Sequence, residues 1–155
     1  MAEQSLALLG EPRVREFLSA ARVARLATAE RSGAPHAVPL CFWFDGARFY
    51  FIIDEKPKAQ SGLRLKRMRN IAENPQVALI VDHYEEDWGA LAFVMVRGRA
   101  RVIDNDDEEY LLAMRNLRDK YQQYRAMALT PDRNPIVCIE PARVNVWGAR
   151  FAQHR

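Results

Sequence analysis

The chain has 155 residues, of which 49% are hydrophobic and 28% are charged, and its formal net charge is +3. This length fits one globular domain with a sizeable core, so we expect a single domain over residues 1–155. The apolar runs are too short to cross a bilayer and the N-terminus lacks a signal-peptide pattern, so we expect a cytoplasmic protein. The small net charge does not indicate a surface that binds nucleic acid throughout.

The N-terminal part of the chain predicts a helix followed by a β-hairpin. Apolar residues recur at helical spacing over residues 11–21. The period then becomes that of strands over residues 23–29 and 36–44, with Gly33 and Pro35 as turn signals between them. Because both faces of 36–44 are apolar, we expect this strand to be buried on both sides. Pro39 cannot donate a ladder hydrogen bond, which places an interruption or a sheet edge there.

A third strand and a basic segment follow. The Asp45-Gly46 pair is a turn signal before a strand over residues 47–54. Residues 56–75 then concentrate Lys and Arg, and their second half, 62–73, has a helical pattern. Two faces are expected on this helix: an apolar one with Leu65, Met68, Ile71 and Ala72, and an opposite one with Leu63, Lys66, Arg67 and Asn70. Lys66 and Arg67 should therefore project together, in an arrangement suited to holding a phosphate.

The C-terminal half predicts strands on both sides of a helix. Strands are expected over residues 76–84 and 90–104, with a bend or bulge near Gly98. The helix should begin with Asp104 or Asn105 as its cap and carry an apolar stripe that consists of Tyr110, Met114, Leu117, Tyr121 and Tyr124. After a loop over 126–135, two strands, 136–140 and 142–147, are expected around Pro141, followed by a frayed tail.

Residue types with catalytic potential are scattered. The two cysteines lie almost a hundred residues apart and are expected to be buried free thiols. The three histidines lack a metal-binding spacing, so no metal site is expected. Asp82 and His83, with Asp87, form a weak candidate acid/base set, because strand-end turns collect such residues anyway. No motif of a serine hydrolase, phosphate-loop enzyme or Rossmann protein occurs, and we assign no catalytic side chain.

The order of these elements resembles the pyridoxamine-phosphate-oxidase-like split β-barrel superfamily of flavin and deazaflavin oxidoreductases. The resemblance rests on RLATA (25–29), PHAVPLCF (35–42), FIID (51–54), LKRMRNIAENPQVAL (65–79), RGRARV (97–102) and VWGAR (146–150). It implies an α+β fold, mainly antiparallel β, with a six- to seven-stranded split β-barrel of the FMN-binding type and flanking helices. DEKPK (54–58) followed by LKRMRNI is similar to the branch that depends on the deazaflavin coenzyme F-420.

The resemblance also implies a site. In this superfamily the basic loop and helix hold the cofactor phosphate, the second strand lies along the ring, and a homodimer places the cofactor at its interface. Carried over by position, the phosphate residues are Lys58, Lys66 and Arg67 with Ser61 as a hydroxyl donor, the ring residues are Val38, Pro39 and Cys41, and the residues from the partner chain are Trp88, Trp147 and Arg150.

The implied function is hydride transfer between bound coenzyme F-420 and a small organic substrate. Two alternatives stay open: an FMN-binding oxidoreductase of the pyridoxamine 5'-phosphate oxidase-like class, and a non-catalytic cofactor carrier or binding protein. Activity on vitamin B6 phosphates is not expected, because the extra basic and aromatic motifs and the C-terminal segment of true pyridoxamine phosphate oxidases are missing from the sequence. An RNA-binding role is the weakest reading, since the aromatic residues are not interleaved with the basic run. The substrate and the direction of transfer stay open.

Overall fold

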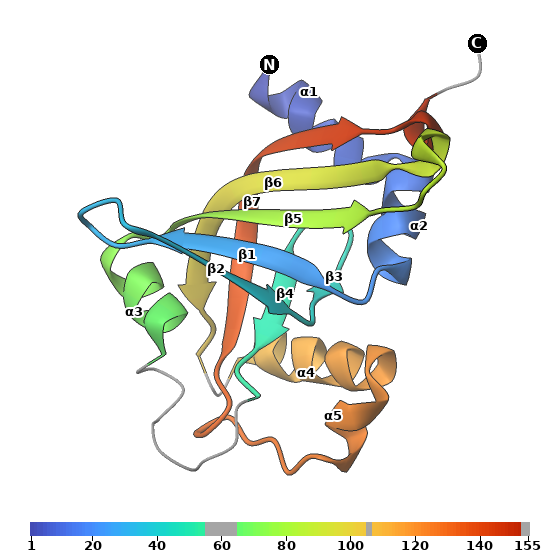
Figure 1. Ribbon diagram of the computed structural model, residues 1–155. Coiled ribbons are helices and arrows are strands. Elements are labelled where there is room, and N and C mark those ends of the chain that lie inside the picture. Colours follow the sequence, from blue (N-terminus) through green and yellow to red (C-terminus); the bar gives the residue numbers. More distant parts are fainter. Residues whose placement is uncertain (55–64, 105–106, 153–155) are drawn as a thin grey trace.

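Seven antiparallel strands form one sheet that curls into a half-barrel, with helices around it (Figure 1). The structure is a computed structural model that describes residues 1–54, 65–104 and 107–152. The strand order is β2-β1-β5-β6-β7-β4-β3. The strands are β1 Ala24–Ala29, β2 Pro35–Leu40, β3 Trp43–Phe44, β4 Phe49–Ile52, β5 Gln76–His83, β6 Ala92–Val102 and β7 Ile136–Trp147. The helices are α1 Ala2–Ala7, α2 Pro12–Ala20, α3 Lys66–Glu73, α4 Glu108–Lys120 and α5 Gln122–Ala126, with short 3-10 turns at Leu8–Gly10, Trp88–Ala90 and Ala149–Phe151. The α+β split-barrel prediction is confirmed.

The two longest strands, β6 and β7, pair through a bulge that bends the sheet. Gly98 lies opposite Pro141 and Arg97 lies opposite Arg143, so Ala142 is the extra residue. A Cβ at Gly98 would lie 2.9 Å from the carbonyl carbon of Glu140 and closer still to its oxygen, so only glycine fits. The bend predicted at Gly98 is confirmed. The prediction of two strands around Pro141 is wrong, because the bulge accommodates the missing N–H and β7 continues.

Two hydrophobic cores hold the helices to the sheet. One lies between the inner sheet face and helices α2 and α3, and it includes Phe17, Leu26 and Met68. The other lies between β4, β7 and helices α4 and α5 (Figure 1). All five members of the apolar stripe predicted for residues 110–124 are buried in this second core, which confirms that stripe.

Two helix starts differ from the sequence prediction. The N-cap of α4 is Asp107, whose side chain accepts a hydrogen bond from the Glu109 N–H, so Asp104 is not the cap, and Asn105 lies outside the described residues. Helix α1 was not predicted because it is too short for a periodic signal. It is held by Ser5, whose Oγ donates to the Val144 carbonyl oxygen at 2.9 Å and accepts from the Val144 N–H at 2.5 Å.

None of the helices in the described ranges combines the length and the apolar character that a bilayer-spanning segment requires.

Candidate functional site

A cavity of about 430 Å³ lies beside the edge strand β2, and we call it the edge-strand cavity. Its lining residues are Val23, Val38, Pro39, Leu40, Cys41, Phe51, Ile52, Asp54, Arg67 and Tyr124. Four of these were predicted as cofactor residues, namely Val38, Pro39, Cys41 and Arg67. Helix α3, strand β2 and Cys41 directly after it therefore bring one predicted phosphate residue and three predicted ring residues to the same space.

Strand β2 forms the wall of this cavity as an edge strand. It pairs with β1 alone, and Pro39 lies opposite Arg25 in that register. Its residues alternate between exposed and half-buried, so the prediction of burial on both sides is wrong for this chain. The apolar sequence of β2 predicted that other elements would cover both of its faces. Among the described residues, no elements cover both faces of this strand. The edge position predicted from Pro39 is confirmed, and it leaves the backbone on the other side of β2 without a partner strand among the described residues.

The two predicted phosphate residues at the start of the basic helix α3 have different surroundings. Lys66 forms an ion pair with Glu30, in the turn between β1 and β2, whereas Arg67 lines the edge-strand cavity. The two side chains thus do not project together as the helical pattern had predicted. Asn70 was also placed with them on the polar face, but it is only 1% exposed and its amide donates to Thr28 Oγ1 at 3.0 Å.

The polar end of the cavity was not predicted from the sequence. Tyr124 Oη donates to Asp54 Oδ2 at 2.6 Å. Burial is the main cause that raises the pKa of Tyr124 far above its ordinary value, and the hydrogen bond and charge of Asp54 raise it further. The phenol therefore stays protonated and acts as a fixed donor to the carboxylate. Seventy positions separate these residues, and no local pattern reveals such a pairing.

A further ionisable group that the sequence did not reveal lies beside Phe42, the residue after Cys41. Lys120 Nζ sits 4.0 Å from the ring centroid of Phe42, and its amine has no hydrogen-bond partner among the described residues. Burial, with a smaller contribution from the charge of Arg22, lowers the pKa of Lys120 to about 8. Tyr121 Oη accepts from the Phe42 N–H at 3.0 Å and ties this end of the helix to the strand.

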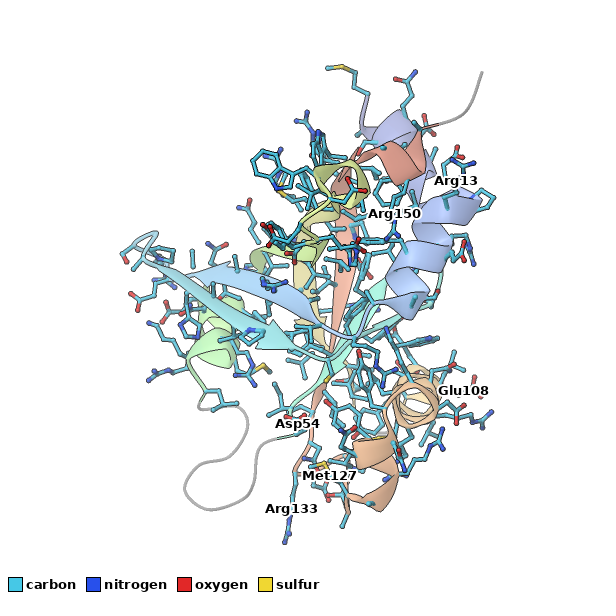
Figure 2. All side chains as sticks on the ribbon, turned by 45° about the vertical axis from the view of Figure 1, so that its right-hand side comes forward. Arg13, Asp54, Glu108, Met127, Arg133 and Arg150 are labelled. Carbon is cyan, nitrogen blue, oxygen red and sulfur yellow. The ribbon has the colours of Figure 1, made fainter. Side chains whose placement is uncertain are left out.

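The remaining predicted site residues lie elsewhere. Trp88 is 73% exposed, Trp147 is 54% exposed and stacks on Phe93 at 5.8 Å, and neither lines the edge-strand cavity. Arg150 lies near Arg13 at one end of the molecule, far from Asp54 (Figure 2). Two predicted phosphate-site residues, Lys58 and Ser61, fall outside the described residues, as does Leu63 on the predicted polar face of α3.

The candidate acid/base set does not converge on this cavity. Asp82 is paired with Arg25, and the Nε2 atom of His83 lies 2.5 Å from Glu85 Oε1. Within the described residues, His, Cys, Asp and Glu side chains form no group that could hold a metal ion. The edge-strand cavity thus combines apolar walls, the edge strand β2, the Arg67 guanidinium and the hydrogen-bonded Asp54–Tyr124 pair. The guanidinium can bind a phosphate, and the apolar walls can accommodate a flat ring.

Solved structures support the fold. HutZ, a haem storage protein from Vibrio cholerae, superposes with a TM-score of 0.72 at 18% identity, covering 91% of this chain and 98% of that one. A structure described as an F420 reductase superposes with a TM-score of 0.59 at 21% identity, covering 84% of this chain and 94% of that one. At these identities the likeness concerns the fold alone.

Sequence comparison gives the family. The chain is 31% identical over 94 residues to 5a,11a-dehydrotetracycline/5a,11a-dehydrooxytetracycline reductase from Streptomyces rimosus. That match covers 60% of this chain and 63% of the reductase, which is less than two thirds of its length. The family described as pyridoxamine 5'-phosphate oxidase matches residues 11–148, nearly the whole chain. The chain therefore belongs to the pyridoxamine 5'-phosphate oxidase family.

Proposed function

We propose that the protein is an oxidoreductase that binds coenzyme F-420 in the edge-strand cavity and transfers a hydride between it and a small organic substrate. The observation that carries this proposal is the convergence of Arg67 with Val38, Pro39 and Cys41 on one cavity beside an open strand edge. Family membership and the reductase relative support redox chemistry.

Each part of the cavity has a role in the proposal. Arg67 binds the cofactor phosphate, since a guanidinium matches phosphate in both charge and geometry. The ring lies along Val38, Pro39 and Cys41, where β2 has no second partner strand among the described residues and its edge offers backbone hydrogen bonds. The Tyr124–Asp54 pair closes the cavity as a fixed polar end. The ring system supplies the hydride chemistry when bound, and the chain binds it, orients it and excludes water.

Lys66 has a lesser role than Arg67 in this proposal. Its ammonium is already paired with the carboxylate of Glu30, so it would have to leave that partner to reach a phosphate. Lys58 and Ser61 stay in the proposal as phosphate residues, and they lie outside the described part of the chain.

FMN is the alternative cofactor, because the family takes its description from an oxidase of pyridoxamine 5'-phosphate and because FMN carries the same kind of phosphate and flat ring. The absorbance and mass of whatever copurifies with the protein distinguish the two. We expect a bound deazaflavin, or a colourless protein that binds added F-420, and reduction of an enone or quinone in a single turnover. FMN absorbance would favour the alternative cofactor. A haem spectrum, or tight cofactor binding without turnover of any acceptor, would contradict the proposed activity.

We further propose a homodimer that brings Trp88 and Trp147 of one chain toward the cofactor of the other. Supporting this, Trp147 lies opposite Phe93 in the β6–β7 register, and Ile80 lies opposite Met95 on the same outward face of the sheet. These four side chains are exposed or half-buried in the single chain. Arg150 is left out of this proposal because its guanidinium lies over Phe17 of its own chain. A sedimentation mass near 17.8 kDa at micromolar concentration would contradict the dimer.

A further inference from the structure

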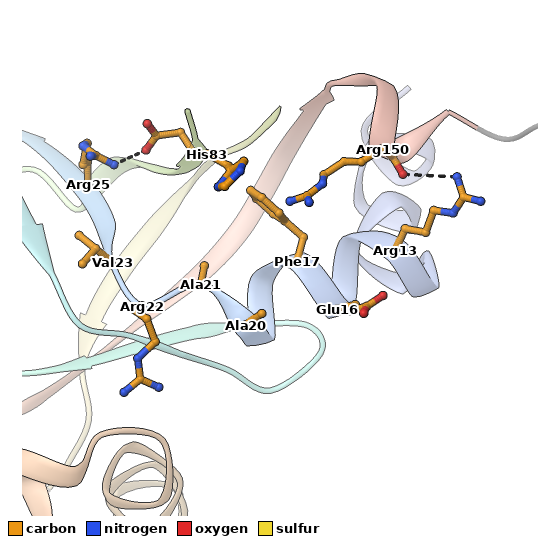
Figure 3. Close-up of a pocket in the computed structure, with 11 residues that line it drawn as sticks. Arg13, Glu16, Phe17, Ala20, Ala21, Arg22, Val23, Arg25, His83 and Arg150 are labelled. Atoms are coloured by element: carbon orange, nitrogen blue, oxygen red, sulfur yellow. Dashed lines mark hydrogen bonds and ion pairs between the residues drawn. The ribbon is translucent and has the colours of Figure 1, made fainter. Parts of the chain in front are cut away.

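A second cavity, of about 650 Å³, opens between α2, the end of β5 and the C-terminal 3-10 turn. Its charged lining residues are Arg13, Glu16, Arg22, Arg25, Asp82 and Arg150, and we call it the arginine cavity. Figure 3 shows the ring of Phe17 between His83 and the guanidinium of Arg150. Four arginines and two carboxylates leave the lining with an excess of positive charge.

Two of these arginines have different kinds of partner: a carboxylate for Arg25 and backbone carbonyl oxygens for Arg13. Arg25 forms an ion pair with Asp82, across neighbouring strands β1 and β5. Arg13 Nη1 donates instead to two backbone carbonyl oxygens, that of Ala152 at 2.7 Å and that of Arg150 at 3.4 Å. Carbonyl oxygens hold a guanidinium in place without cancelling its charge. Arg13 therefore fixes the C-terminal turn and adds to the positive potential of the cavity.

Arg150 is the arginine best placed to bind a ligand. Its guanidinium carbon lies 5.3 Å from the centroid of the Phe17 ring, and no carboxylate forms a salt bridge with it among the described residues. Phe17 is packed in the core and also contacts Phe151 edge to face at 5.2 Å. The arginine is thus held over a rigid aromatic surface, with its hydrogen-bond donors available to an anion.

The floor of the cavity is apolar. Phe17, Ala20, Ala21 and Val23 line it between the charged side chains. Ligand sites of this size are commonly apolar with a few convergent polar groups that fix orientation. We propose that the arginine cavity binds an amphipathic organic anion, with its carboxylate, sulfonate or phosphate against Arg150 and its aromatic part against the apolar floor.

This site adjoins the proposed cofactor site. Val23 lines both the arginine cavity and the edge-strand cavity, so a molecule that fills the first reaches the border of the second. We therefore assign the arginine cavity to the acidic part of the redox substrate. This assignment to a substrate rests on the proposed function, whereas binding of the anion does not.

Titration of the folded protein with 8-anilinonaphthalene-1-sulfonate, followed by its fluorescence, tests the site. Arg150→Met keeps much of the apolar stem and removes the charge, and we expect it to weaken binding of this probe by roughly tenfold or more. The matched control is Arg143→Met. Arg143 is an exposed residue of β7 outside the cavity, so this substitution should leave binding unchanged. The neutral probe N-phenyl-1-naphthylamine should bind wild-type protein more weakly than the sulfonate. Equal loss in both variants, or equal binding of both probes, would overturn the proposal.

A second variant is expected to strengthen binding of the sulfonate instead of weakening it. Asp82→Asn removes the carboxylate that neutralises Arg25, so the sulfonate should bind severalfold more tightly. Unchanged or weaker binding in a folded Asp82→Asn protein would count against the site. FMN and F-420 affinities measured on Arg150→Met separate this inference from the proposed function. The cofactor affinities of Arg150→Met should equal those of the wild type. A loss of both cofactor and sulfonate binding would show that the arginine cavity belongs to the cofactor, and would overturn the proposal of a separate site.

Discussion

Lys120 is a charged side chain in an apolar setting at the end of α4. Its amine lies over the rings of Phe42 and Tyr121, and burial lowers its pKa from 10.5 to about 8. Below pH 8 the amine is protonated in both the folded and unfolded states, so the cost of burying the charge is fully present. Between pH 8 and 10.5 only the unfolded state binds this proton, and stability should therefore rise with pH.

Lys120→Met should stabilise the protein at pH 7 by about 1 kcal/mol, after allowing for the half-buried position of the side chain and for the lost contact of its amine with the rings. The gain should shrink as pH rises from 8 to 10.5. Urea unfolding at several pH values measures it, with Arg115→Met on the exposed side of the same helix as the control. A gain that stays constant across this pH range would show that burial does not shift the titration of Lys120.

Residue roles in the cavity were only partly predictable from the sequence. Val38 and Pro39 lie on β2 and Cys41 follows its last residue, so their common position follows from local order. Lys66 and Arg67 are neighbours with equal charge, and only the tertiary position of Glu30 divides them. The Asp54–Tyr124 hydrogen bond joins the end of β4 to α5, and no local rule predicts such a contact.

At the scale of the elements, Gly98 at the β6–β7 bulge is a position where the backbone leaves no room for a side chain. Gly98→Ala should destabilise the fold by about 1–3 kcal/mol, because its methyl group would meet the backbone of Glu140 and the sheet would have to open. The matched control is Gly10→Ala, where a Cβ meets no atom within 4 Å. Denaturant unfolding of both variants gives the comparison. Equal stabilities would mean that β7 moves aside at little cost.

Element order was predictable because each strand and helix has its own local period and turn signal. Two predictions were wrong for the same reason: contacts with residues distant in sequence decide whether a strand is buried and whether it continues past a proline. Strand β2 reads as buried from its apolar residues, yet its position at the sheet edge leaves it exposed in the single chain. Pro141 predicted a break between two strands, yet the bulge opposite Gly98 allows β7 to continue as one strand.

At the scale of the molecule, the edge-strand cavity and the arginine cavity share Val23, which lies in the link between α2 and β1. The edge-strand cavity contains one arginine and the Asp54–Tyr124 pair among apolar residues, and the arginine cavity contains four arginines and two carboxylates over an apolar floor. In the proposed function, the edge-strand cavity binds the flat phosphorylated ring and the neighbouring arginine cavity binds the organic anion. A redox enzyme that brings a cofactor and an acidic substrate together requires two such neighbouring sites.

Arg67 is the central residue of the proposed cofactor site, as the phosphate anchor of the edge-strand cavity. The decisive measurement is the dissociation constant of F-420 and of FMN for wild type, Arg67→Met and Lys66→Met, each shown to be folded. Arg67→Met should weaken binding of the preferred cofactor by about tenfold to a hundredfold, the value of one charge-assisted contact. Lys66→Met should change it by less than about threefold, because Lys66 is paired with Glu30. Unchanged binding in Arg67→Met, or an equal loss in Lys66→Met, would contradict the account.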